Sequence, residues 1–177
     1  MRAPLEREKR RAIGGPREEP RNRRMLPDDT FEVKLTETMA AVRAWSGFVA
    51  DVAEVEDTEI GDAWHFGLVP HMAGACPVEV VVRRGDQRCD LTIAGETYED
   101  VELGNLDLLP KLIAAVADGR VIRRHGVSRT TGLRHFTATI VHLPDGSVFE
   151  AAHASPGAPA VEAEIEWRDL HFLPYRR

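Results

Sequence analysis

Residues 78–103 read VEVVVRRGDQRCDLTIAGETYEDVEL and contain three short apolar segments separated by turn signals. The segments have the length and residue types of β-strands, and run from Val78 to Arg84, from Cys89 to Ala94 and from Thr97 to Leu103. Gly85-Asp86 and Ala94-Gly95 supply the turns between them. Strands joined by such short turns pair antiparallel, because a parallel pair needs a long crossover. The stretch therefore predicts an antiparallel meander.

Short strands are also predicted on both sides of this meander. They cover Ala63 to Val69, Arg120 to Val127, Leu133 to Leu143, Ser147 to Ala152 and Val161 to Phe172. Within Leu133 to Leu143, apolar and polar side chains alternate, which predicts one buried face and one solvated face. The buried face would hold Phe136, Ala138 and Ile140, and the solvated face His135, Thr137 and Thr139.

Two helices interrupt the strands. Leu109, Leu112, Ile113 and Val116 follow the i, i+3, i+4, i+7 spacing, between the N-cap candidate Asp107 and Gly119. A second helix is predicted from the N-cap candidate Thr36 to Gly47, with Leu35, Met39 and Val42 on one face. Residues 48–60 fit either a continuation of this helix or an exposed segment. We expect an α+β fold, in which an antiparallel sheet of about six to eight strands carries one or two helices on one face.

Charge divides the 177 residues into a tail and a body. Residues 1–28 are predicted to be a disordered basic tail, and residues 29–177 a single α+β domain. Residues 1–24 carry a net charge of +5, whereas the remainder carries −11. An acidic body repels a phosphate backbone, so a nucleic-acid partner is not expected. Two hypotheses account for the basic segment: either Met25 is the true start of the native protein, or the segment is a basic arm that folds onto an acidic partner.

The sequence also favours a cytoplasmic protein without a membrane partner. No apolar run approaches the roughly 20 residues that span a bilayer, and the N-terminus lacks an apolar signal-peptide core. Two cysteines do not form a disulfide framework, so both thiols are expected to be free.

The most unusual local feature is a basic strip that no acidic residue interrupts. It consists of Arg120, Arg123, Arg124, His125, Arg129 and Arg134. Ser128 and Thr130 add hydroxyl donors in the hairpin loop, and His135 follows the last arginine. Guanidinium groups and hydroxyls suit an anionic small molecule or an acidic protein partner. The alternative is that these arginines pair with the surplus carboxylates on neighbouring strands.

Two histidines and two cysteines, namely His65, His71, Cys76 and Cys89, have the residue types of a zinc site. Their spacing matches no zinc motif, since the chain has no Cys-x-x-Cys and no His-Glu-x-x-His. The competing interpretation is that both cysteines are small buried apolar residues.

An apolar cluster near the C-terminus contains Trp167, Leu170, Phe172, Leu173 and Tyr175. It either closes the core or forms an exposed edge through which the chain self-associates. Because no catalytic constellation has a recognised spacing, we expect a non-enzymatic binding or accessory domain. The alternatives are a metal-assisted hydrolase that uses the His and Cys residues, and a domain that binds a small apolar ligand between the sheet and the 108–118 helix.

Overall fold

The computed structural model describes residues 26–101, 105–155 and 164–176. Residues 1–25 of the predicted tail lie outside them, and Asp28 is already the first residue of a helix. The elements of the described part are α1 (Asp28–Ser46), β1 (Ala53–Ile60), β2 (Ala63–Pro70), β3 (Val78–Arg83), β4 (Arg88–Ile93), β5 (Glu96–Val101), α2 (Leu108–Ala117), β6 (Val121–Ser128), β7 (Arg134–His142), β8 (Val148–Ala154) and β9 (Ile165–His171). The expected α+β fold with antiparallel strands is confirmed.

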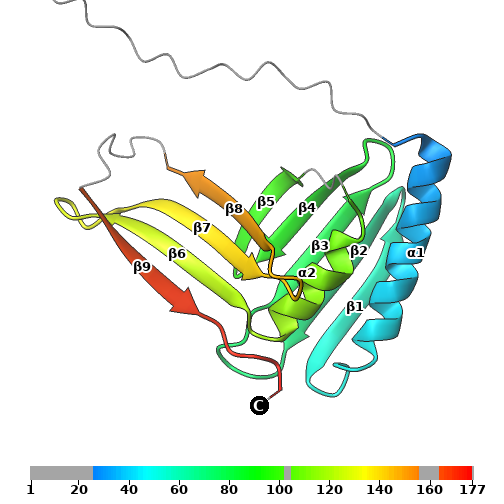
Figure 1. Cartoon of the computed structure of the whole chain (residues 1–177), viewed down its shortest axis with the longest axis horizontal. Helices are drawn as coiled ribbons and strands as arrows, with labels where there is room; N and C mark the ends of the chain where they lie inside the picture. The colour runs from blue at the N-terminus through cyan, green and yellow to red at the C-terminus, as the bar shows by residue number, and fades with distance from the viewer. Residues whose placement is uncertain (1–25, 102–104, 156–163, 177) are drawn as a thin grey trace, which may run out of the picture.

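The strands are divided between two sheets rather than joined in one (Figure 1). In the described part of the chain, the first sheet has five strands in the order β1-β2-β3-β4-β5, and the second has four in the order β8-β7-β6-β9. All pairs of neighbouring strands are antiparallel. The sheets separate after β5, because α2 carries the chain away from that edge before β6 begins.

The meander of residues 78–101 forms as the turn residues predict. Ile93 pairs with Glu96 across a two-residue turn, in which Ala94 and Gly95 both have positive φ. Such a turn matches the natural twist of a hairpin and fixes the register of its strands. The register therefore carries Glu96 to the start of β5, at the edge of the first sheet.

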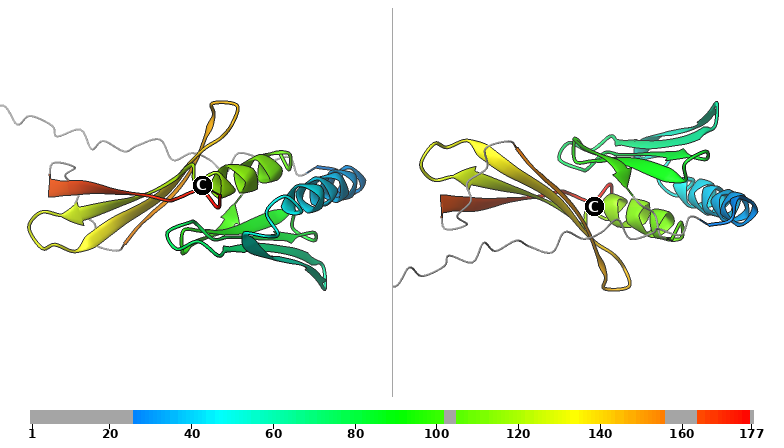
Figure 2. Two further views of the ribbon diagram at one scale, coloured as in Figure 1. Left: turned by 90° about the horizontal axis from the view of Figure 1, so that it is seen from below. Right: turned by 90° about the horizontal axis from the view of Figure 1, so that it is seen from above.

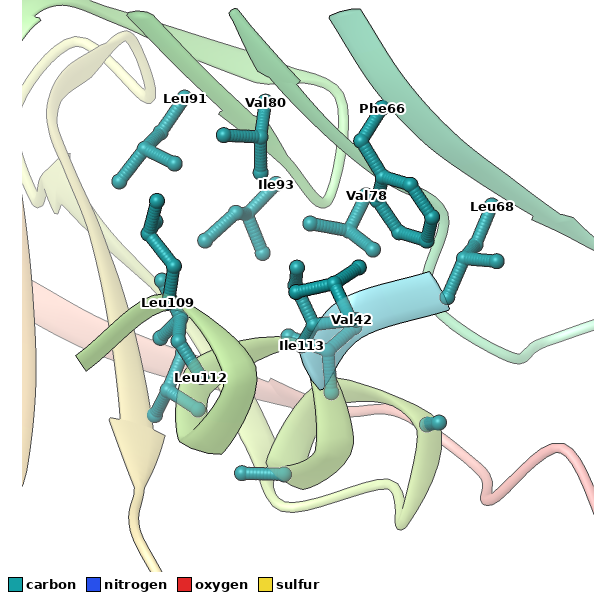
Figure 3. Packing of buried hydrophobic residues seen from close by; sticks show 14 of the residues in the cluster. Val42, Phe66, Leu68, Val78, Val80, Leu91, Ile93, Leu109, Leu112 and Ile113 are labelled. Carbon is teal, nitrogen blue, oxygen red and sulfur yellow. The ribbon is translucent and has the colours of Figure 1, made fainter. Parts of the chain in front are cut away.

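The main core lies between one face of the first sheet and the two helices (Figure 2). Phe66, Val80 and Leu91 extend from the sheet toward Leu109 and Ile113 of α2 (Figure 3). The predicted face of α2 is therefore buried as expected. The apolar-ligand alternative places its ligand between these two layers and stays a prediction.

The first helix begins nine residues earlier than predicted, since its N-cap is Pro27 rather than Thr36. Two aspartates stand in its first turn, where carboxylates favour the positive end of the helix dipole. Thr36 is not an N-cap, since its hydroxyl donates to the carbonyl of Glu32 within the helix at 2.8 Å. Residues 53–60 form strand β1 instead of extending the helix.

The second sheet projects from the body and joins it mainly at one end (Figures 1 and 2). Val121 and Val141 belong to the core cluster, and Phe172 packs against it. The hydroxyl of Tyr175 donates to the carbonyl of Cys76 at 2.7 Å, which fastens the C-terminal segment. Tyr175 therefore closes the core, whereas Trp167 and Leu170 are exposed on β9.

The prediction that Thr137 and Thr139 of β7 lie on a solvated face is wrong. Thr137 and Thr139 are only 3% and 0% exposed. Their face of the second sheet turns toward β5 of the first sheet, where Tyr98 contacts Thr139. On the other side of the sheet, Ala138 and Ile140 are buried as predicted, whereas Phe136 is half-buried and lines an open groove.

In the described part of the chain, no helix has the length and apolar character needed to cross a membrane.

Candidate functional site

The basic strip is divided between the two faces of the second sheet. Successive residues of a strand point to opposite faces, so Arg123 and Arg124 point apart. Arg124 donates two hydrogen bonds of 2.8 Å to the carboxylate of Asp169 on β9 and is neutralised there. Arg120 precedes β6 and lies 3.7 Å from Asp118. The strip is therefore not one continuous basic surface.

Polar residues from both sheets meet where the second sheet faces β5. We call this set the junction cluster, and it consists of Glu96, Tyr98, Arg123, His125, Arg134, Thr137 and His153. The Glu96 carboxylate is 3.4 Å from Nε2 of His153 and 3.8 Å from a terminal nitrogen of Arg134. The Tyr98 ring centroid lies 5.9 Å from that of His153. The structure thus gathers two arginines and two histidines of the second sheet beside one carboxylate of the first.

Arg123 is the least neutralised cation of the cluster. Its guanidinium donates to the carbonyl of Ala94 at 2.5 Å and lies 5.9 Å from the ring centroid of Phe172. Among the described residues, no carboxylate oxygen lies within 4.0 Å of it. Its Nε is buried and has no hydrogen-bond acceptor among the described residues. A buried donor without an acceptor is unfavourable by about 1–3 kcal/mol, so this arginine is held in place at a cost to stability.

Burial and the positive charges of the cluster lower the pKa of His125. Its Nδ1 lies 3.5 Å from the hydroxyl of Thr137. Burial lowers the pKa of His125, and the positive charges of Arg134 and Arg123 lower it further. Glu96 raises the pKa but offsets only part of this effect. A bound anion would act in the same direction as Glu96.

A cleft between the edge strands β5 and β8 gives access to two members of the cluster. It has a volume of about 500 Å³, and its walls include Thr97, Tyr98, Glu99, Ala151 and His153. The cluster members on its walls are Tyr98 and His153, and the exposed Glu99 adds a carboxylate beside them.

The remaining predicted anion-site residues lie outside the cluster. Ser128 is buried and its hydroxyl accepts the Thr131 N–H at 3.2 Å, which is a turn contact. Arg129 and Thr130 are exposed in the β6–β7 loop. His135 is half-buried, and its Nδ1 has no partner in the described part. The sequence interpretation missed Glu96, Tyr98 and His153, which come from other strands.

The predicted zinc ligands are not brought together. Cys76 and Cys89 are buried in the core, whereas His65 points to the uncovered face of the first sheet and His71 is exposed after β2. Burial raises the pKa of each thiol to about 12, which disfavours the thiolate that zinc requires. Within residues 26–101, 105–155 and 164–176, no three His, Cys, Asp or Glu side chains are grouped as metal ligands.

The opposite face of the second sheet carries a shallow groove of about 760 Å³. Phe136 and Trp167 lie in it with ring centroids 5.9 Å apart, on either side of Gly126. A Cβ atom at Gly126 would lie 2.9 Å from the Trp167 ring and 3.0 Å from Phe136. Glycine at this position therefore lets both rings close over the backbone of β6.

Comparison of the chain with protein-family models, curated proteins and solved structures finds no match.

Proposed function

We propose that this protein is a non-enzymatic binding domain whose junction cluster recognises a carboxylate or phosphate group. The observation that carries the proposal is Arg123, a half-buried cation whose Nε is fully buried and which has no carboxylate partner in the described part of the chain. An incoming anion would supply the negative charge that Glu96 alone does not. Charge-assisted hydrogen bonds to such a group contribute about 1.5–3 kcal/mol each.

The distribution of charge along the chain supports this assignment. Residues 26–119 contain 6 Lys or Arg against 19 Asp or Glu, whereas residues 120–177 contain 8 Arg against 6 Asp or Glu. The second sheet is thus the part of the body toward which an anion is attracted, and the acidic remainder repels it. Long-range repulsion of this kind favours a small anion or a short acidic segment over a nucleic acid.

Calorimetric titration tests the proposal with three probes, namely inorganic phosphate, ATP and a polyglutamate peptide. We expect at least one probe to bind and its affinity to fall as salt increases. Arg123→Met keeps the alkyl packing on Phe172, and Arg134→Ala removes the second cation. Together they should weaken binding by about tenfold or more, whereas Arg120→Ala, outside the cluster, should not.

The choice of probe distinguishes the source of the anionic group. Binding of the peptide without phosphate or ATP assigns the site to an acidic protein segment, and the converse assigns it to a small molecule. An NMR titration of His125 gives a second readout, since a bound anion should raise its pKa. The proposal fails if the parent chain binds none of the probes, or if the double variant binds as tightly as the parent.

A further inference from the structure

We propose that two copies of this chain associate through β9 and join their second sheets into one antiparallel sheet, with Trp167 facing its own copy across a two-fold axis. This interface is independent of the proposed anion recognition. The occupant of the β9 edge is therefore a second copy of the chain.

The edge of β9 has backbone groups available for pairing. Strand β9 pairs with β6 on one side and ends the described sheet on the other. Phe172 N–H donates to the carbonyl of Val121, and the carbonyl of Glu164 accepts from Arg129. Backbone groups alternate in direction along a strand, so those of Trp167 and Asp169 point outward. An edge of this kind is a template for another strand.

The side chains of β9 permit one symmetric register. A two-fold axis between antiparallel strands passes through one position, so the residue there faces its own copy. Registers centred on Trp167, Arg168 or Asp169 keep at least five residues of β9 paired. The latter two place identical charges opposite each other, which is destabilising.

The register centred on Trp167 is complementary instead. It sets Glu166 opposite the second copy's Arg168, and this pair occurs twice by symmetry. Within one chain the two residues already form an ion pair of 2.9 Å, so both lie on one face of the strand. The new contacts would extend that pair into a four-residue network across the interface.

Trp167 supplies the apolar centre of the interface. It is 45% exposed although it is a large aromatic residue. The Phe136 ring centroid lies 5.9 Å from that of Trp167, and Gly126 leaves room for the Trp167 ring beside the backbone of β6. Rigid, supported aromatic side chains of this kind are common centres of protein interfaces. In each copy, the first sheet and the two helices lie beyond the C-terminal end of β9 (Figure 1). Antiparallel pairing of the two β9 strands therefore places these parts of the two copies at opposite ends of the joined sheet.

Sedimentation velocity and native mass spectrometry of the full chain test this interface. We expect dimers that dissociate on dilution. Glu166→Arg and Arg168→Glu should each weaken self-association by about tenfold or more, because each sets like charges opposite one another. An equal mixture of the two variants should form heterodimers, because the arginine introduced in one copy then faces the glutamate introduced in the other. Rescue by mixing cannot come from an ion pair within one chain.

Glu150→Arg, which makes the same charge change on the opposite edge strand β8, is the matched control and should leave the dimer intact. The proposal is overturned if the parent chain is monomeric at every concentration, or if the single variants associate as the parent does. It is also overturned if mixing restores no dimer, or if Glu150→Arg alone abolishes it.

Discussion

Tyr98 on β5 donates a 2.7 Å hydrogen bond to Oγ1 of Thr139 on β7, and this buried bond links the two sheets. Both side chains are almost fully enclosed. Because the second sheet otherwise projects from the body, such contacts determine how its inner face meets the first sheet. The position of the junction cluster depends on them.

Replacing Tyr98 with Phe should lower the free energy of unfolding by about 1–2 kcal/mol, because the Thr139 hydroxyl would remain buried without its partner. Urea denaturation measures the effect. Thr139→Val removes the other partner, and the double variant should be less destabilised than the sum of the two single changes. Additive single changes would show that the two hydroxyls do not stabilise each other.

Gly119 and Gly132 provide a matched pair, with φ angles of +73° and +72°. Among the described residues, nothing lies within 4 Å of a Cβ atom at Gly132, so Gly132→Ala should cost only the left-handed conformation, about 1–2 kcal/mol. A Cβ atom at Gly119 would lie 2.5 Å from the Pro174 nitrogen. Gly119→Ala should therefore cost about 1–3 kcal/mol more. Equal thermal shifts for the two variants would contradict the close approach of the C-terminal segment.

Asp57 should make stability depend on acidic pH. The hydrogen bond from Arg43 lowers the pKa of Asp57, burial opposes this shift, and the Trp64 indole N–H lowers the pKa further. Because the folded pKa lies below the unfolded one, ionised Asp57 stabilises the fold above the unfolded value of about 4. That contribution is lost as the pH falls through the folded pKa.

Asp57→Asn retains an acceptor for Trp64 but removes the charge. The difference in free energy of unfolding between parent and variant should be largest near neutral pH and should shrink under acid. Denaturation at a series of pH values measures it. A difference that does not change with pH would exclude a contribution from the charge of Asp57.

The two thiols should be inert in the folded chain. Burial raises the pKa of Cys76 and of Cys89 to about 12, and the thiolate is the reactive form. Iodoacetamide should therefore modify them slowly under native conditions and rapidly in denaturant, as followed by mass spectrometry. Rapid modification of either cysteine in the native protein would contradict its place in the core.

The proposed site could be predicted only in part. Arg123, His125 and Arg134 are visible as an uninterrupted basic strip, because their signal is local in sequence. Glu96 and His153 carry no local signal, since each is one of many charged or polar residues at a strand end. They become partners of the strip only when β5 and β8 approach β6 and β7. The division of Arg123 from Arg124 follows from strand alternation, but which face meets the first sheet does not.

The sequence by itself determined most of the local elements, although it predicted neither strand β1 nor the start of α1. The 3.6-residue spacing of Leu109, Leu112 and Ile113 specifies α2, and the Ala94-Gly95 turn specifies a hairpin, because both signals act over a few residues. The tertiary structure decided how the strands divide between two sheets and which faces are buried. Thr139 illustrates this, because its alternation with Ile140 predicts a solvated position, and only the contact with Tyr98 of the other sheet encloses it. Such contacts join residues distant in the chain, and no local periodicity encodes them.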